Sequence, residues 1–172
     1  MALDIFGLCL QGSTDKEEIL KIPDNIMVIS ERAFANCSYI KKIIFNDGIK
    51  HIGPSAFENC TGLEEITITG DLNIIYERAF KGCTNLKAIN ILNASPSILD
   101  EAFAGCTNLS TLNIPNKTKE LSFSAFHNCP LLKKLDIAKI SSTEEKEEKL
   151  ETSIDEMDII DSMIAMSGLD DE

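Results

Sequence analysis

The chain has 172 residues, 44% of them hydrophobic, which is enough for one domain with a buried core. Its net charge is −12, and most of the acidity lies at the C-terminal end, where residues 139–172 carry 12 acidic and 3 basic side chains. No cluster of Lys and Arg suits phosphate, so nucleic acid is excluded as a partner. No stretch approaches the ~20 apolar residues of a membrane span.

Residues 1–10 are apolar apart from Asp4. They lack a basic leader and a small-residue cleavage site, so we expect folded structure there and no signal peptide. The expected location is cytoplasmic, and the alternative is the cell surface, reached by an unseen route. Residues 1–21 are predicted to form an N-terminal cap with a degenerate half-repeat, because Leu20 and Ile22 already follow the strand positions of the repeats.

Residues 22–138 repeat every 23 residues without insertion or deletion. Each repeat carries the motif Ala-Phe-x-x-Cys, and the five motifs begin at Ala33, Ala56, Ala79, Ala102 and Ala125. A fixed period of this length is typical of a solenoid, in which each unit buries its apolar face against its neighbours. We therefore predict a solenoid of five repeats.

Each repeat is predicted to form one parallel strand and one short helical turn. Leu63, Ile66 and Ile68 illustrate the Leu-x-x-Ile-x-Ile segment, whose end alternates apolar and polar residues as a half-buried strand does. The segment that precedes and includes Ala-Phe is compatible with a helical turn. The predicted fold class is an α/β leucine-rich-repeat solenoid, curved into an arc with a concave strand face.

Five of the six cysteines occupy one equivalent position, next to the predicted core, and Cys9 stands outside the series. This placement favours small buried side chains with free thiols. The sequence has no Cys-x-x-Cys pair and no Cys/His cluster, so we expect no metal site. His51 and His127 occupy different repeat positions, and no nucleophile has an orienting base. We therefore expect no catalysis and no cofactor.

The repeat Ile-x-x-x-Ala-Phe-x-x-Cys-x-x-Leu-x-x-Ile-x-Ile resembles the leucine-rich repeats of the BspA-like family, over residues ~20–138. The resemblance implies a non-catalytic surface protein that mediates adhesion and protein–protein contact. The asparagine ladder of better-known leucine-rich repeats is missing, because its position falls on Gly48, Asp71, Ala94 and Lys117. Other contacts must therefore stabilise the stacking.

The concave strand face is the first candidate surface for a partner protein. Its residues between core positions are small, polar and mixed in charge, without aromatic anchors. The candidate contact residues are Lys42, Ile44, Glu65, Thr67, Asn90, Thr111, Asn113 and Lys134. A merely solvated sheet is the alternative interpretation.

Residues 139–172 form the second candidate surface, an acidic tail with an amphipathic pattern. Its apolar residues recur at helical spacing, at Leu150, Ile154, Met157, Ile160 and Ile164. A terminal cap, a helix that binds a partner and a disordered acidic tail all fit this pattern.

The predicted function is an intracellular, non-catalytic protein-binding module. A cell-surface adhesin is one alternative, and an acidic inhibitor or immunity-type protein acting through its tail is another. An exposed end of a solenoid can pair with a second copy, so a homodimer through such an end is a further expectation.

Overall fold

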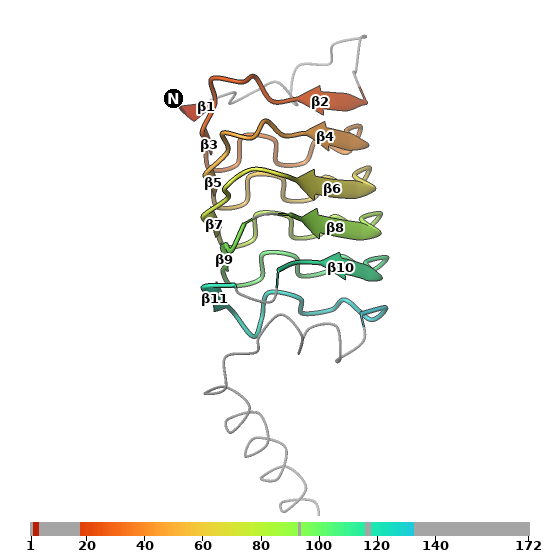
Figure 1. Ribbon diagram of the computed structural model, residues 1–172. Helices are drawn as coiled ribbons and strands as arrows, with labels where there is room; N and C mark the ends of the chain where they lie inside the picture. Colours follow the sequence, from red (N-terminus) through yellow and green to blue (C-terminus); the bar gives the residue numbers. More distant parts are fainter. Residues whose placement is uncertain (1, 4–17, 93, 116–117, 133–172) are drawn as a thin grey trace, which may run out of the picture. The chain divides into compact units, whose positions relative to one another are not determined.

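The computed structural model describes residues 2–3, 18–92, 94–115 and 118–132. In this part of the chain two parallel sheets alternate along the sequence, with even-numbered strands in one and odd-numbered strands in the other (Figure 1). The five-stranded sheet consists of β2 Ile19–Lys21, β4 Lys42–Ile44, β6 Glu65–Ile68, β8 Ala88–Ile91 and β10 Thr111–Asn113. The six-stranded sheet consists of β1 Ala2–Leu3, β3 Val28–Ile29, β5 His51–Ile52, β7 Ile74–Ile75, β9 Ser97–Ile98 and β11 Glu120–Leu121.

The register of both sheets follows the sequence period. Glu65 in β6 pairs with Ala88 in β8, and His51 in β5 pairs with Ile74 in β7, each 23 residues further along the chain. Equivalent residues of successive repeats therefore lie side by side, and each repeat forms one rung of the stack. This confirms the predicted leucine-rich-repeat solenoid with parallel strands.

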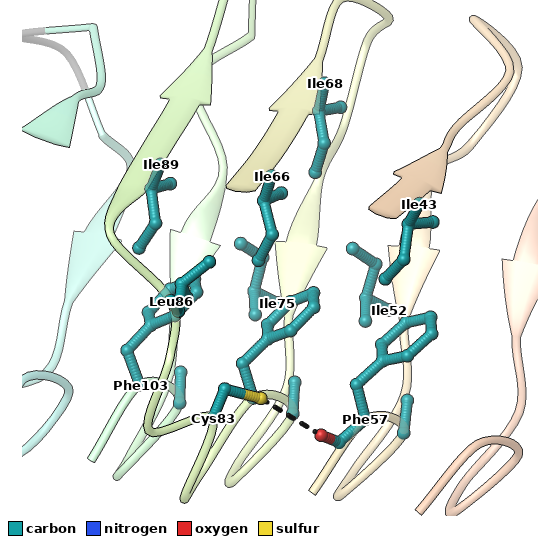
Figure 2. Packing of buried hydrophobic residues seen from close by; sticks show 14 of the residues in the cluster. Ile43, Ile52, Phe57, Ile66, Ile68, Ile75, Cys83, Leu86, Ile89 and Phe103 are labelled. Atoms are coloured by element: carbon teal, nitrogen blue, oxygen red, sulfur yellow. Dashed lines mark hydrogen bonds between the residues drawn. The ribbon is translucent and has the colours of Figure 1, made fainter. Parts of the chain in front are cut away.

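The core between the two sheets contains a continuous stack of phenylalanine rings. Phe57, Phe80 and Phe103 are fully buried, and their ring centroids lie 5.1 and 5.2 Å apart with interplanar angles of 7° and 1° (Figure 2). Phe34 and Phe126 extend the stack at its two ends. Rows of buried Ile and Leu flank the rings, and each such side chain contributes about 1.5–3 kcal/mol.

The predicted short helical turn is wrong, because the described residues contain no helix. The backbone amides around each Ala-Phe pair alternate between two kinds of acceptor. The amide of Phe57 donates to the carbonyl of Ala79 in the next rung at 2.7 Å, whereas the amide of Glu58 donates to Ser55 three residues earlier at 3.1 Å. In an α-helix each backbone amide donates to the carbonyl four residues earlier. Amides that donate to the neighbouring rung therefore exclude a helix here.

Left-handed backbone flanks each of these turns. In the second repeat, Ser55 and Asn59 have φ values of 52° and 58°, and the equivalents of Asn59 in the next two repeats, Gly82 and Gly105, both have 73°. Asn and Gly tolerate this region best, which explains why one of them precedes the cysteine. The second sheet was not predicted, because its strands have only two residues in each repeat.

The cysteines form a ladder along the turns. The thiols of Cys60, Cys83, Cys106 and Cys129 each donate to the backbone carbonyl of the phenylalanine in the preceding rung, at 3.1–3.4 Å. These four thiols are free and buried, as predicted. Cys37 is disulfide-bonded, so the expectation of a free thiol is wrong at that position. The ladder supplies contacts between rungs where an asparagine ladder is missing.

Candidate functional site

The outward side chains of the five-stranded sheet form two rows, which together we call the strand face. Seven of the predicted contact residues lie in these rows, because they alternate with the buried positions of each strand. One row contains Lys42, Glu65 and Thr111, and the other contains Ile44, Thr67, Asn90 and Asn113. Lys134 and the five tail residues, Leu150, Ile154, Met157, Ile160 and Ile164, lie outside the described residues.

Hydrogen bonds join four of these side chains into one network across three rungs. The amide of Asn113 donates to the carbonyl oxygen of Asn90 at 2.6 Å. Asn90 in turn donates to the Glu65 carboxylate at 2.8 Å, and the Thr67 hydroxyl donates to the same carboxylate oxygen at 3.2 Å. Because Glu65 and Asn113 keep further donor or acceptor capacity, the network offers hydrogen bonds at fixed positions.

Apolar side chains border this network. Ile44 lies in the same row as Thr67, and Leu92 follows the end of β8; both are exposed. Ile19 in β2 is exposed as well. A polar network beside exposed apolar groups resembles the mixed composition of protein interfaces.

Ion pairs between neighbouring rungs hold one side of the strand face. Lys87 lies 3.0 Å from Glu64, and Lys41 lies 2.6 Å from Glu18. The hydrogen bond and charge of Lys87 lower the pKa of Glu64, and Glu18 raises the pKa of Lys41 in the same way. These exposed pairs fix side-chain positions more than they stabilise the fold.

A second surface was missed by the sequence analysis. A shallow groove of about 580 Å³ crosses the turns that follow the strands of the six-stranded sheet. Its lining residues are Glu31, Arg32, Pro54, Ser55, Glu77, Arg78, Asp100, Glu101 and Ser124. Two columns of the repeat supply all of them, because the two residues before each Ala-Phe pair stack from rung to rung. Their residue types differ between repeats, so no motif marks the groove in the sequence.

An ion-pair cluster lies at the groove. Nε of Arg78 and Nζ of Lys81 both lie 2.8 Å from one oxygen of Glu101, from the neighbouring rung. Lys81 first and Arg78 second lower the pKa of Glu101 through these hydrogen bonds. In the next rung, Ser122 and Ser124 both donate to the Asp100 carboxylate.

Three thiols of the cysteine ladder, those of Cys60, Cys83 and Cys106, are poor nucleophiles. Burial raises the pKa of Cys60 to about 12 and that of Cys83 well above its usual range. The neighbouring Cys129 thiol, followed by burial, raises the pKa of Cys106. The thiolate is the reactive form of cysteine, and a raised pKa keeps these thiols protonated. These side chains therefore contribute to packing rather than to catalysis.

The described part of the chain holds neither a metal centre nor a membrane-spanning helix. No group of three or more His, Cys, Asp or Glu side chains there is arranged to hold a metal ion. None of its segments forms a helix long and apolar enough to cross a membrane.

The repeat register and the Phe and Cys ladders agree with a family comparison. The model of the family described as "BspA type leucine rich repeat region" matches six repeat copies, over residues 11–133 and 83–164. The chain belongs to this BspA-type leucine-rich-repeat family. Repeat proteins of this kind generally serve as binding scaffolds without catalysis.

Solved structures of bacterial leucine-rich proteins share this fold. A leucine rich cell surface protein from Faecalibacterium prausnitzii is 32% identical, with a TM-score of 0.64, over 74% of this chain and 35% of that chain. A leucine-rich repeat protein from Eubacterium ventriosum is 20% identical, with a TM-score of 0.54, over 68% of this chain and 38% of that one. The chain thus spans little more than a third of these relatives. No curated protein matches it significantly.

Proposed function

We propose that this BspA-type solenoid is a non-catalytic protein-binding module whose strand face contacts the partner. The observation that carries the proposal is the network of Glu65, Thr67, Asn90 and Asn113. The strands beneath it are paired in register and the side chains already bond to one another, so a partner that hydrogen-bonds to them pays little entropy for ordering them. Exposed Ile44 and Leu92 add apolar area beside it.

A selection of displayed peptides on the full-length protein tests this proposal. Selected peptides should lose about fivefold or more in affinity when Asn90→Ala or Asn113→Ala removes the network. The matched control is Asn85→Ala, because Asn85 is an exposed asparagine in a turn, away from both rows. Equal binding by the wild type and both network variants would contradict the proposal.

The same selection separates the strand face from the tail. A tail variant replaces Glu151, Asp155, Asp158 and Asp161 by their amides, which keeps the chain full length. A strand-face module should bind its peptides unchanged after this replacement. Loss of binding in the tail variant alone, together with strong salt dependence, would favour the acidic-inhibitor alternative.

For the location, one comparison favours the surface alternative over the cytoplasm. The F. prausnitzii relative, at 32% identity, is described as a cell surface protein. We therefore propose that this module is displayed outside the cell, where its partner is another surface or matrix protein. Brief trypsin treatment of intact source cells should release its peptides. Release only after lysis would support the cytoplasmic location instead.

The expected homodimer through an end of the solenoid stays a prediction. Light scattering, measured as the protein elutes from a size-exclusion column, gives its molecular mass at several loading concentrations. A mass of two chains that persists on dilution would confirm the dimer.

A further inference from the structure

The groove beside the Ala-Phe turns has an unbalanced set of charges. Four carboxylates and two guanidinium groups line it. Arg78 and Lys81 both pair with the single carboxylate of Glu101, so this cluster keeps one net positive charge. Arg32, near Glu31, is the other lining cation.

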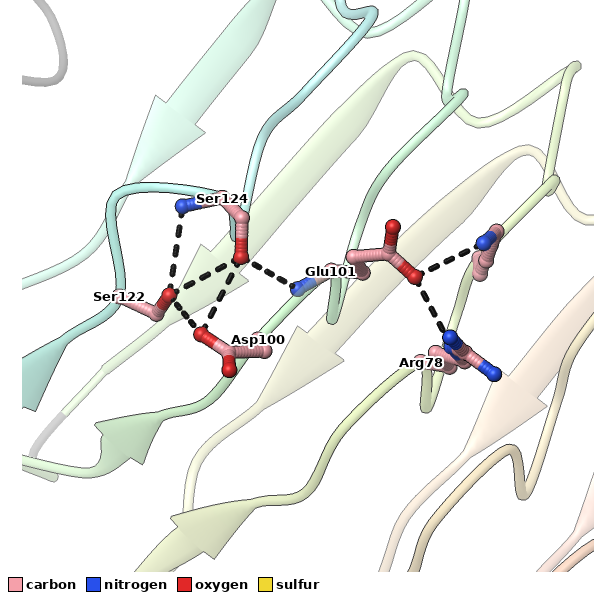
Figure 3. Close-up of polar contacts among 6 residues, drawn as sticks. Arg78, Asp100, Glu101, Ser122 and Ser124 are labelled. Carbon is pink, nitrogen blue, oxygen red and sulfur yellow. Dashed lines mark hydrogen bonds and ion pairs between the residues drawn. The ribbon is translucent and has the colours of Figure 1, made fainter.

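Three lining carboxylates keep acceptor capacity toward solvent. Glu31 and Glu77 form no side-chain hydrogen bond or ion pair within the described residues. Asp100 accepts the hydroxyls of Ser122 and Ser124 on one oxygen only, which leaves its second oxygen available (Figure 3). These three residues share one repeat position, which Pro54 occupies in the rung between Glu31 and Glu77, so they form a line with one rung interrupted.

An exposed aromatic residue ends this line. Phe123 occupies the repeat position of Asp100 and Glu77 in the last described rung, between the two serines that contact Asp100. Its exposed fraction is 75%, the highest among the large apolar residues described. Exposed aromatic side chains of this kind are typical anchors for a partner.

The length of the line sets the size of the partner segment. Four rung spacings of roughly 4.8 Å separate the positions of Glu31 and Phe123, about 19 Å in all. An extended peptide covers this span with about six residues. The backbone of the groove is fixed by hydrogen bonds between rungs, such as that from the Arg78 amide to the Asp100 carbonyl at 3.0 Å.

We propose that this groove binds an extended basic segment of a partner protein. Lys or Arg side chains of the segment pair with Asp100, Glu77 and Glu31, and an apolar side chain packs on Phe123. The carboxylates give the charge complementarity that steers a basic segment to the groove, and Phe123 adds apolar burial. This surface is distinct from the strand face, so the two proposals stand or fall separately.

A labelled hexapeptide tests the groove. The first probe alternates lysine with threonine and ends in leucine. A second probe has the reversed sequence, because the segment can run along the groove in either direction. Fluorescence anisotropy on the full-length protein should show binding of at least one probe that weakens as salt rises. The double variant Glu77→Gln/Asp100→Asn should weaken it by about fivefold or more, and Phe123→Ser should weaken it as well.

A matched control separates this site from the general acidity of the chain. Asp47→Asn/Asp71→Asn removes the same charge at two exposed residues in the segments that connect the two sheets, and it should leave probe affinity unchanged. Amide chemical shifts of the wild type should move at residues 77–78, 100–101 and 122–124. Three outcomes would overturn the proposal: equal loss in both double variants, no loss in either, or shifts confined to residues 142–172.

Discussion

The thiol of Cys83 donates a hydrogen bond to the backbone carbonyl of Phe57 in the preceding rung, over a sulfur–oxygen distance of 3.3 Å (Figure 2). The same carbonyl accepts the amide of Cys60 at 3.2 Å. One carbonyl thus joins the end of its own turn to the next repeat. The repetition of this contact along the stack explains why the sequence keeps cysteine at a constant spacing.

Full burial predicts low reactivity for three thiols of the ladder. Cys60, Cys83 and Cys106 are fully buried, and their raised pKa values keep them protonated at neutral and mildly alkaline pH. N-ethylmaleimide should leave them unmodified in the native protein and label them after denaturation in guanidinium chloride. Mass spectrometry of the digested protein reads each site, and rapid labelling of Cys83 in the native state would contradict the burial.

Substitution in the ring stack should be costly, unlike substitution at the surface. Phe80→Ala removes a fully buried ring that stacks on both sides, so we expect a loss of about 3–5 kcal/mol in the free energy of unfolding. Phe123→Ala is the matched control, and its effect should stay within about 0.5 kcal/mol because the ring is exposed. Urea denaturation measures both, and similar losses in the two variants would exclude the stack as the source of stability.

The left-handed backbone at Asn59 predicts a particular order of stabilities. Asn59→Ala should destabilise the fold by about 1–2 kcal/mol, because alanine lacks the short polar side chain with which asparagine tolerates a φ of 58°. Asn59→Gly should cost less, since glycine adopts this region freely, although the bond from Asn59 to Asn36 is lost. If glycine proves as costly as alanine, the side-chain contact rather than the backbone determines the residue.

The cluster around Glu101 predicts a pH dependence of stability. Lys81 and Arg78 lower the pKa of Glu101 in the folded state. A lowered folded pKa contributes stability above the unfolded pKa of about 4.3, and this contribution is lost as pH falls through the folded pKa. The stability difference between wild type and Glu101→Gln should therefore be largest at neutral pH and shrink in acid.

A second background checks the cause of this dependence. In a Lys81→Met protein the effect of Glu101→Gln should be smaller, because the first partner of the carboxylate is gone. Chemical denaturation between acidic and neutral pH measures all four proteins. An effect of Glu101→Gln that is unchanged in the Lys81→Met background would assign the pH dependence to other groups.

The sequence predicted the repeat and its core well. The period of 23 residues is the register of both sheets, and the motif residues Phe80 and Cys83 are buried as expected. The helical turn was predicted wrongly, because the pattern around Ala-Phe contains no signal for amides that bond to the next rung. The odd-numbered strands were missed since two residues are too short for an alternating pattern.

The candidate sites, too, were predicted from the sequence only in part. Alternation placed Glu65 and Asn90 on the outward face of a strand, and the strand register brings them into contact. The groove was missed because the residues before each Ala-Phe pair vary from repeat to repeat. Only stacking shows that Arg78 meets Glu101 and that Phe123 follows Asp100.

The sequence by itself therefore determined the period, the buried rows and the family, because these depend on apolar residues that recur at fixed spacing. The tertiary structure decided where the backbone amides bond and which polar side chains meet on the surface. Those hydrogen bonds and ion pairs join residues 20–26 positions apart, and they form only when one rung lies against the next.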